Sequence, residues 1–480
     1  MAGDTPQNDL PSTIASLSLP ATAMPSLSLP ATAMPSLSFA ALLRLATPVV
    51  VSRLGIMTMG LVDAVVVGQY SSTQLGFQAL GWAPTGVVIT TAVGLLSGVQ
   101  VMTSQAIGDG RVAETGAILR RGCAYAFWIG IVAAAILAGL GGPVMHNLGL
   151  DPVLADGATP VLQVLALSLL PILIADAGVF WLEAHGRAVP GMIAMWGANV
   201  VNLLLNLWLV PGGNMFGISG AVASSWSTFV SRVALLVFVW ILIARWPQAR
   251  ALGVFSRAPR DPVAAAEMRR VGYGASVSYT VEAGSFAAMS IFAGWLGAQA
   301  VASWAIVLNV AALIFMVPLG LSTATSVFVG RAHGAGDAAG VRRAAALGFR
   351  ATLMVTLVIC VIVAVGNHAL AAGYTSDPAV QRVAAAALLL SCLFYVADGL
   401  QVVAAQALRA RADIWMPTVT HFASYILVMM PAGYALAVGM GLGVNGLVGA
   451  IILASLMSAA LLWGRFMWLD RFSSATPRSG

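Results

Sequence analysis

Twelve long apolar stretches constrain most strongly what this chain can fold into. A helix that crosses a bilayer needs about 20 mostly apolar residues. The stretches of this length are Leu45–Gly68, Trp82–Gln105, Gly122–Gly142, Pro160–Glu183, Gly191–Val210, Gly217–Ile243, Val271–Gly294, Trp304–Gly330, Ala344–Val365, Val383–Ala407, Met416–Val438 and Val444–Met467. They take up most of the chain, so the sequence predicts an all-α integral membrane protein with twelve transmembrane helices and no separate soluble domain.

The composition excludes several other classes of protein. Only 8% of the residues are charged and 59% are hydrophobic, whereas soluble domains are about 25% charged. A soluble enzyme, a disordered chain and a nucleic-acid-binding protein are therefore not expected. Cys123, Cys360 and Cys392 show neither metal spacing nor an even disulfide framework. The chain also lacks a phosphate-binding loop and a His-Glu metal motif, so we expect no enzyme activity, no cofactor and no bound transition metal.

The Arg residues predict the orientation in the membrane. The chain has no Lys, and nineteen of its 23 basic residues lie near the chain ends or in every second loop, while the opposite loops hold only Arg382. Cytoplasmic loops carry an excess of basic residues. We therefore expect a multi-pass protein of the cell inner membrane with both termini in the cytoplasm.

An internal repeat predicts the domain organisation. A shift of 226 residues brings Gly94-Leu95 onto Gly320-Leu321 and Gly217–Gly220 onto Gly443–Gly446. Six spans in each half make the halves parallel repeats, an architecture typical of transporters. The predicted segments are a disordered cytoplasmic tail with a repeated decapeptide (1–41), a six-helix bundle (42–244), a cytoplasmic linker (245–270), a second six-helix bundle (271–468) and a cytoplasmic tail (469–480).

Charged residues within the spans indicate the functional site, because a charge at mid-span costs about 2.5–3.5 kcal/mol. Glu183 and Arg350 lie near cytoplasmic ends, where we expect them to reach the headgroups. Asp63, Glu282 and Asp398 are the candidate residues for ion coupling and substrate binding. Buried carboxylates can exchange protons near neutral pH or, grouped with amide oxygens, hold a cation such as Na⁺.

Supporting roles are predicted for other polar residues of the spans. Asn199, Asn202 and Asn206 are spaced at three and four residues on one helical face and could supply amide oxygens or bond to another helix. Arg53 and Arg232 are expected to pair with buried carboxylates, and such a salt bridge is the alternative role for the three acids. Asp176 aligns with Asp398 under a shift of 222 and is either a relic of symmetry or a fourth site.

Several motifs carry a resemblance to a known family. Leu61–Gly68, Gly94–Gly110 and Val329–Asp337 resemble, in this order, motifs of the multidrug and toxic compound extrusion (MATE) transporters. Glu282 and Asp398 look like the acidic pair of the NorM branch, and Asp63 matches a further acid in span one. Two features depart from the family pattern: Arg331 stands where the second half usually has Gln, and the N-terminal repeat has no counterpart.

The resemblance implies a function and a shape. It implies two bundles around a V-shaped central cavity, and export of cationic amphipathic drugs and dyes in exchange for protons or Na⁺. We expect a monomer whose partners are these small molecules and the membrane lipid. Two alternatives remain open at this point: a flippase for lipid-linked precursors in the same superfamily, and a membrane receptor or scaffold that transports nothing.

Overall fold

The computed structural model describes residues 37–147, 151–256 and 261–473, and every regular element within these ranges is helical. The repeated decapeptide, and with it most of the predicted N-terminal tail, lies outside the described residues, as do residues 474–480 of the predicted C-terminal tail.

The first half of the chain forms its helices in the order of the predicted spans. They are α1 (Phe39–Tyr70), α2 (Ser72–Gly108), the 3₁₀ turn η1 (Val112–Glu114), α3 (Thr115–Asn147), α4 (Pro152–Leu167), α5 (Leu169–Ala184), α6 (Ala188–Leu209) and α7 (Gly220–Ala244). A turn at Ser168 separates α4 from α5, and the two together make one span.

The second half repeats this plan after the short helix α8 (Gln248–Ala251). Its elements are α9 (Pro262–Trp295), α10 (Ala298–Gly334), α11 (Ala338–Tyr374), α12 (Pro378–Ala410), α13 (Trp415–His421), the π-helix η2 (Phe422–Met429), α14 (Met430–Gly433), the π-helix η3 (Tyr434–Gly439) and α15 (Gly443–Ser473).

Short polar signals start these helices. Asp151, Asp261 and Asp377 each accept a hydrogen bond from a backbone N–H in the first turn, and a proline follows each of them. An acidic N-cap satisfies a free N–H, and proline at the next position has none to satisfy. Three apolar helices thus begin at defined residues although their side chains alone would not mark a boundary.

Eleven spans within the described residues are long and apolar enough to cross a membrane. The remaining long helix, α9, has 34 residues but carries Glu267, Arg269, Arg270 and Glu282. Its polarity follows from its place, because Glu282 and Tyr279 of α9 line a cavity between the halves. With α9, the fold contains the twelve transmembrane helices that the sequence predicts.

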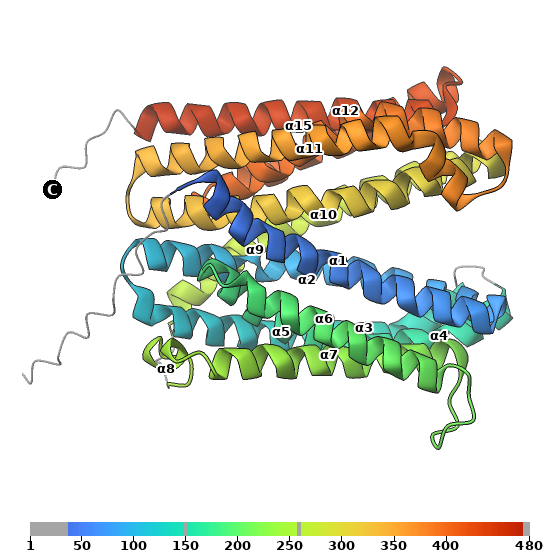
Figure 1. The fold of residues 1–480 in the computed structure, drawn as a ribbon, viewed down its shortest axis with the longest axis horizontal. Coiled ribbons are helices and arrows are strands. Elements are labelled where there is room, and N and C mark those ends of the chain that lie inside the picture. The colour runs from blue at the N-terminus through green and yellow to red at the C-terminus, as the bar shows by residue number, and fades with distance from the viewer. Residues whose placement is uncertain (1–36, 148–150, 257–260, 474–480) are drawn as a thin grey trace, which may run out of the picture. The chain divides into compact units, whose positions relative to one another are not determined.

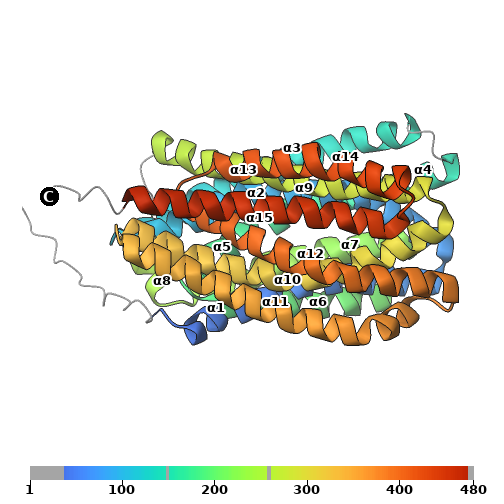
Figure 2. The ribbon, with the colours of Figure 1, turned by 90° about the horizontal axis from the view of Figure 1, so that it is seen from above.

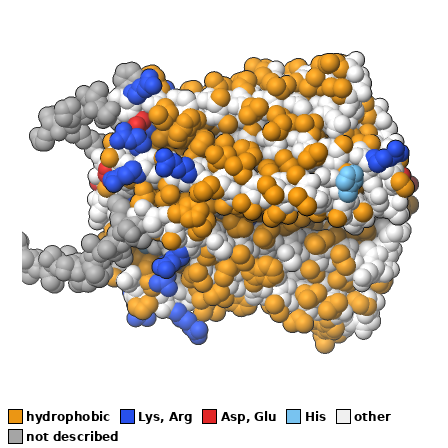
Figure 3. Space-filling model, turned by 45° about the horizontal axis from the view of Figure 1, so that its top comes forward, with side chains coloured by type: hydrophobic (Ala, Val, Ile, Leu, Met, Phe, Trp, Pro, Cys, Tyr) orange, Lys and Arg blue, Asp and Glu red, His pale blue; other side chains and the backbone are white. Residues whose placement is uncertain are grey.

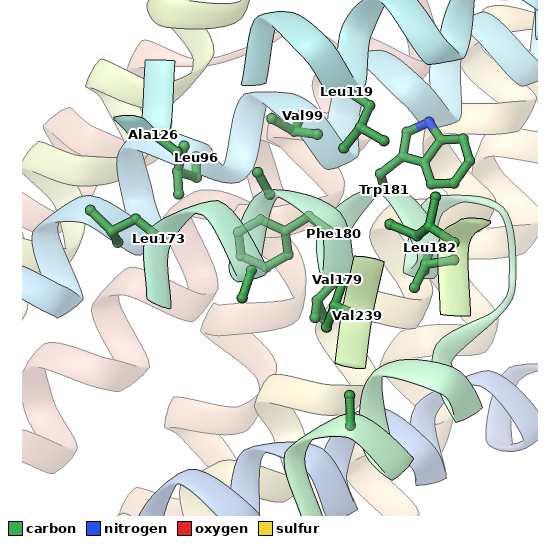
Figure 4. Packing of buried hydrophobic residues seen from close by; sticks show 14 of the residues in the cluster. Leu96, Val99, Leu119, Ala126, Leu173, Val179, Phe180, Trp181, Leu182 and Val239 are labelled. Atoms are coloured by element: carbon green, nitrogen blue, oxygen red, sulfur yellow. The ribbon is translucent and has the colours of Figure 1, made fainter. Parts of the chain in front are cut away.

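Each half has its own buried core. In the first half, Leu96 and Val99 of α2 pack with Phe180 and Trp181 of α5 and Val239 of α7 (Figure 4). A second core joins α9, α10, α12 and α15 around residues such as Trp304, Leu388 and Tyr425. Because lipid is as apolar as these side chains, close packing rather than expulsion from water holds such helices together.

The two halves meet through α1, α2, α9 and α10. Helix α1 packs against α10, and α2 packs against both α9 and α10 (Figures 1 and 2). We call the end where α1 begins and α2 and α10 end the Arg-rich end, because Arg44, Arg111, Arg331 and Arg342 lie there. Figure 3 shows most of the visible Arg side chains near one end of an otherwise largely apolar surface.

The eleventh span is locally widened. Pro431 has no N–H to donate to the preceding turn, and the π-helices η2 and η3 lie on either side of α14, which contains it. A proline inside a helix removes one backbone bond and clashes with the turn before it, and π-helical turns often occur at functional sites. Tyr425 lies within η2 and is completely buried.

Candidate functional site

A cavity of about 560 Å³ lies between the halves. Its walls are mostly apolar and aromatic, and its charged lining residues are Arg53 of α1, Glu282 of α9 and Asp398 of α12. The aromatic lining residues are Phe180, Tyr279, Phe286, Phe315 and Phe394. Pockets of this kind bind small molecules through apolar area and take their orientation from a few polar groups.

The structure brings Glu282 and Asp398 together around Tyr425. The Tyr425 hydroxyl lies 3.5 Å from Glu282 Oε1 and 3.5 Å from Asp398 Oδ1, so its single proton can be donated to either carboxylate. Gln401 Nε2 donates to Asp398 Oδ1 at 3.2 Å and to the Tyr425 hydroxyl at 3.2 Å. Ser458 in turn donates to Gln401 Oε1 at 3.3 Å. Two acids from different helices thus share one set of neutral donors.

Asp63 occupies a different site, enclosed in the first half. Its Oδ1 accepts hydrogen bonds from Asn202 Nδ2 at 3.0 Å and from Asn206 Nδ2 at 2.7 Å. Its Oδ2 accepts from Thr228 Oγ1 at 2.6 Å. Asp63 is 3% exposed and Asn202 and Asn206 are completely buried. The three predicted acids therefore form two sites: Glu282 and Asp398 face the cavity, and Asp63 is outside its lining.

The amide oxygens around Asp63 lack donors. Within the described residues, Oδ1 of Asn199, Asn202 and Asn206 is buried and accepts no hydrogen bond. The Asn199 amide nitrogen bonds to the Met195 carbonyl of its own helix rather than to Asp63. A buried oxygen without a donor costs about 1–3 kcal/mol, and a cation bound beside it would remove this cost.

The Arg residues pair differently from the predicted salt bridges. Arg53 Nη2 lies 3.9 Å from Glu183 Oε1, and Gln100 Nε2 donates to Glu183 Oε2 at 3.0 Å. Arg232 donates to Ser168 Oγ at 2.5 Å and lies over the Trp82 ring. The expectation that Glu183 reaches the headgroups is wrong, since it is 2% exposed. The cause is lateral packing: helices α1 and α2 cover this end of α5 although it is near the end of its span.

Asp176 lies on α5, buried, and its charge interacts with Arg53 and Arg232. It contributes neither to the lining of the cavity nor to the hydrogen bonds around Asp63. Sequence reasoning missed Gln401, Tyr425 and Thr228, which supply the donors of both sites. The spacing of Gln401, three residues after Asp398, was the one local signal that could have indicated one of them.

With this geometry in place, known proteins can be compared. A family model, MatE, matches residues 48–208 and 275–435. The chain belongs to the MATE family. The matched segments begin 227 residues apart (275 − 48), one residue from the shift that relates the two halves.

Relatives and solved structures agree with this assignment. This MATE chain is 49% identical over 429 residues to the probable multidrug resistance protein NorM of Caulobacter vibrioides, which covers 89% of this chain and 91% of that protein. It is 30% identical to multidrug resistance protein PmpM of Pseudomonas aeruginosa, over 82% of this chain and 83% of that one. A solved structure described as the outward-facing conformation of a multidrug resistance MATE transporter has the same fold, with a TM-score of 0.83 and 18% identity over 91% of this chain and 97% of that one.

The predicted family and fold class are therefore confirmed. The chain is a multi-pass membrane protein and a multidrug resistance transporter of the MATE family, NorM type. MATE proteins are ion-coupled antiporters, so this chain is a secondary transporter and not an enzyme.

Proposed function

We propose that the protein exports small cationic amphipathic drugs or dyes across the cell inner membrane in exchange for protons or Na⁺. It works as a monomer, with both termini and the Arg-rich end in the cytoplasm. The observation that carries this proposal is the pair of acids, Glu282 and Asp398, in an aromatic cavity that both halves line. An amphipathic cation finds apolar area for its body and carboxylates for its charge in one place.

The charge of the cavity favours a cation over a pyrophosphate. A flippase for lipid-linked precursors would need several cations facing its cargo. Among the described residues that line the cavity, Arg53 is the only Arg, and it is opposed by two acids. Arg53 is also paired with Glu183. Family membership already places the chain among transporters, which leaves no support for a receptor or scaffold.

The enclosed site suits the coupling cation. Asp63, Asn202, Asn206 and Thr228 offer carboxylate, amide and hydroxyl oxygens in one buried cluster. Oxygen ligands of this kind suit hard cations, and the carboxylate alone could instead take a proton. Helix α1 carries both Asp63 and the cavity-lining Arg53, ten residues or about 15 Å apart along the axis. Binding at the enclosed site can thus act on the cavity through one rigid element.

Dye efflux with separate gradients tests the proposal. Glu282→Gln and Asp398→Asn keep the side-chain shapes and remove one charge each, so we expect normal membrane levels with efflux of a cationic dye near zero. Everted vesicles loaded through a proton gradient or a sodium gradient alone would identify the coupling ion.

The control variant is Glu267→Gln. Glu267 lies on the same helix as Glu282 but is exposed and outside the cavity lining, so we expect efflux at the wild-type rate. Glu183→Gln is unsuitable as a control because Glu183 is the partner of Arg53. Wild-type efflux by both cavity variants, at wild-type membrane levels, would refute the role of the acids.

A further inference from the structure

Direct contacts between the halves lie toward the Arg-rich end. Leu42, Leu45 and Val49 of α1 form a buried cluster with Leu321 and Phe328 of α10. In Figure 1, α1 and α10 lie close together near the start of α1 and diverge toward the other end. The structure is therefore closed at the Arg-rich end, and this closure must open for cargo to be taken up there.

Two hydrogen bonds cross between the halves at this closure. Gln105 Nε2 of α2 donates to the Ala410 carbonyl at 3.0 Å, and Arg331 Nη2 of α10 donates to the Ala184 carbonyl at 2.6 Å. Ala410 is the last residue of α12, and Ala184 is the last residue of α5. The final carbonyls of a helix have no donor within it. Each half therefore caps the C-terminus of a helix in the other half.

The internal repeat relates these two bonds to each other. Adding 226 to Gln105 gives Arg331, and adding 226 to Ala184 gives Ala410. The turns after the acceptors also correspond: Gly186 has φ 76° and Ala412 has φ 66°. The chain thus contains one contact twice, with donor and acceptor exchanged between the halves.

Glycine makes room for both contacts. A Cβ on Gly108 would collide with the Arg331 backbone, and a Cβ on Gly334 would collide with the Gln105 backbone. These two glycines are again 226 residues apart. Each donor residue therefore lies against the other half twice, through its side chain and through its backbone.

We propose that Gln105 and Arg331 are positioning residues that form a pair of latches and hold the Arg-rich end closed. The inference rests on the proposed function only in that transport requires this end to open. Opening removes both donors from both carbonyls. The two latches differ in charge: Arg331 is 8% exposed and directs a cation at a helix C-terminus, which is the favourable sign for the helix dipole. The Arg331 latch is therefore the stronger of the two.

Accessibility of the cavity floor tests the latches without requiring transport. Ser97 lines the cavity on α2, close to the latches, and Ser97→Cys provides a small reporter. Its labelling by a membrane-impermeant thiol reagent is followed in everted and in right-side-out vesicles. The parent protein with serine at this position measures the background from Cys123, Cys360 and Cys392.

Removing the donors should expose the reporter at the Arg-rich end. Arg331→Met and Gln105→Met keep chain length and delete the donor, and each should raise the labelling rate from that end, Arg331→Met by about tenfold or more. Arg331→Gln can still donate and should label nearly as the parent does. Arg343→Gln removes an equal charge from an exposed residue of the same region and should change nothing.

The outcomes separate the latch from the proposed function. Unchanged labelling in the Gln105→Met/Arg331→Met double variant would overturn the latch, whether or not the protein exports dye. Equal effects of Arg331→Gln and Arg331→Met would overturn the role of the donor. If Arg331→Met fails to reach the membrane, Gln105→Met and Arg331→Gln still decide. Loss of dye export with the labelling pattern intact would count against the proposed function alone.

Discussion

Replacing Asp63 by Asn tests where the coupling cation binds. The carboxylate accepts three hydrogen bonds, from Asn202, Asn206 and Thr228. In Asp63→Asn, the remaining oxygen can still accept from the two asparagines, and the Thr228 hydroxyl can turn to accept from the new amide. The variant loses the strengthening that a charge gives these bonds, about 1 kcal/mol each, and is relieved of a buried charge. We therefore expect it to fold.

The cation itself gives the larger signal. If Na⁺ binds at Asp63, a concentration 100 times its Kd adds about 2.7 kcal/mol to the free energy of unfolding. At about 2.1 cal/mol/K for each of the 480 residues, the unfolding entropy is about 1 kcal/mol/K, so the Tm rises by about 3 °C. Asp63→Asn should abolish this rise.

The native cysteines provide the assay. Cys360 is buried, and Cys123 and Cys392 are partly buried, and all three are free. A thiol-reactive fluorophore therefore reports unfolding of the purified protein. Melting curves are recorded in sodium chloride and in choline chloride at equal ionic strength, so that the difference between them measures sodium binding and not screening.

Two buried acids serve as controls. Asp176→Asn lies in the same half but interacts with Arg53 and Arg232 instead, and Glu282→Gln lies at the cavity. Both should retain the sodium-dependent rise in Tm. A full rise in Asp63→Asn, or its loss in Glu282→Gln, would refute the assignment of the cation to the enclosed site. A wild-type protein without any rise would refute sodium as its ligand and leave the proton.

Two further predictions concern the membrane. Cysteines introduced near Ser72, Asp151 and Ser376 should be labelled from outside intact cells, whereas Arg111→Cys and Arg342→Cys should not; labelling of the latter pair would reverse the proposed orientation. Moving one charge through 100 mV is worth about 2.3 kcal/mol, so if two cations enter for each monovalent dye exported, collapsing the membrane potential alone should slow efflux; an unchanged rate at constant pH and sodium gradients would indicate one-for-one exchange.

The sequence was sufficient to predict the helices and the acids, because both depend on local composition. Long apolar runs bounded by polar caps define the spans, and a carboxylate such as Glu282 or Asp398 is conspicuous within them. The neutral donors are not conspicuous. Tyr425 and Thr228 lie 143 and 165 residues from the acids that they contact. Such pairings follow from the packing of helices, which no local pattern encodes.

Position along a span was a poor guide to exposure. Glu183 lies near the end of its span, which predicted contact with headgroups, yet Arg53 and Gln100 pair with it in the protein interior. The register of the repeat was also incomplete. Under the 226-residue shift that relates the ends of α5 and α12, Asp176 corresponds to Val402, one helical turn from Asp398.

The same shift shows how two similar halves support different sites. It relates Arg53 to Tyr279 and Glu183 to Arg409. In the first half, the Arg53 guanidinium is balanced by Glu183. In the second half, the Arg409 guanidinium lies 5.4 Å from the Tyr279 ring and interacts with the charge of Glu282.

This exchange of the cation's position has a consequence for cargo. With both carboxylates ionised, Glu282, Asp398 and Arg409 together carry one net negative charge beside the cavity. One monovalent cation would neutralise the group, whereas a pyrophosphate would increase its net negative charge. The charge balance of this half therefore supports one cationic drug as its occupant, and it leaves the enclosed carboxylate of Asp63 to take the coupling ion separately.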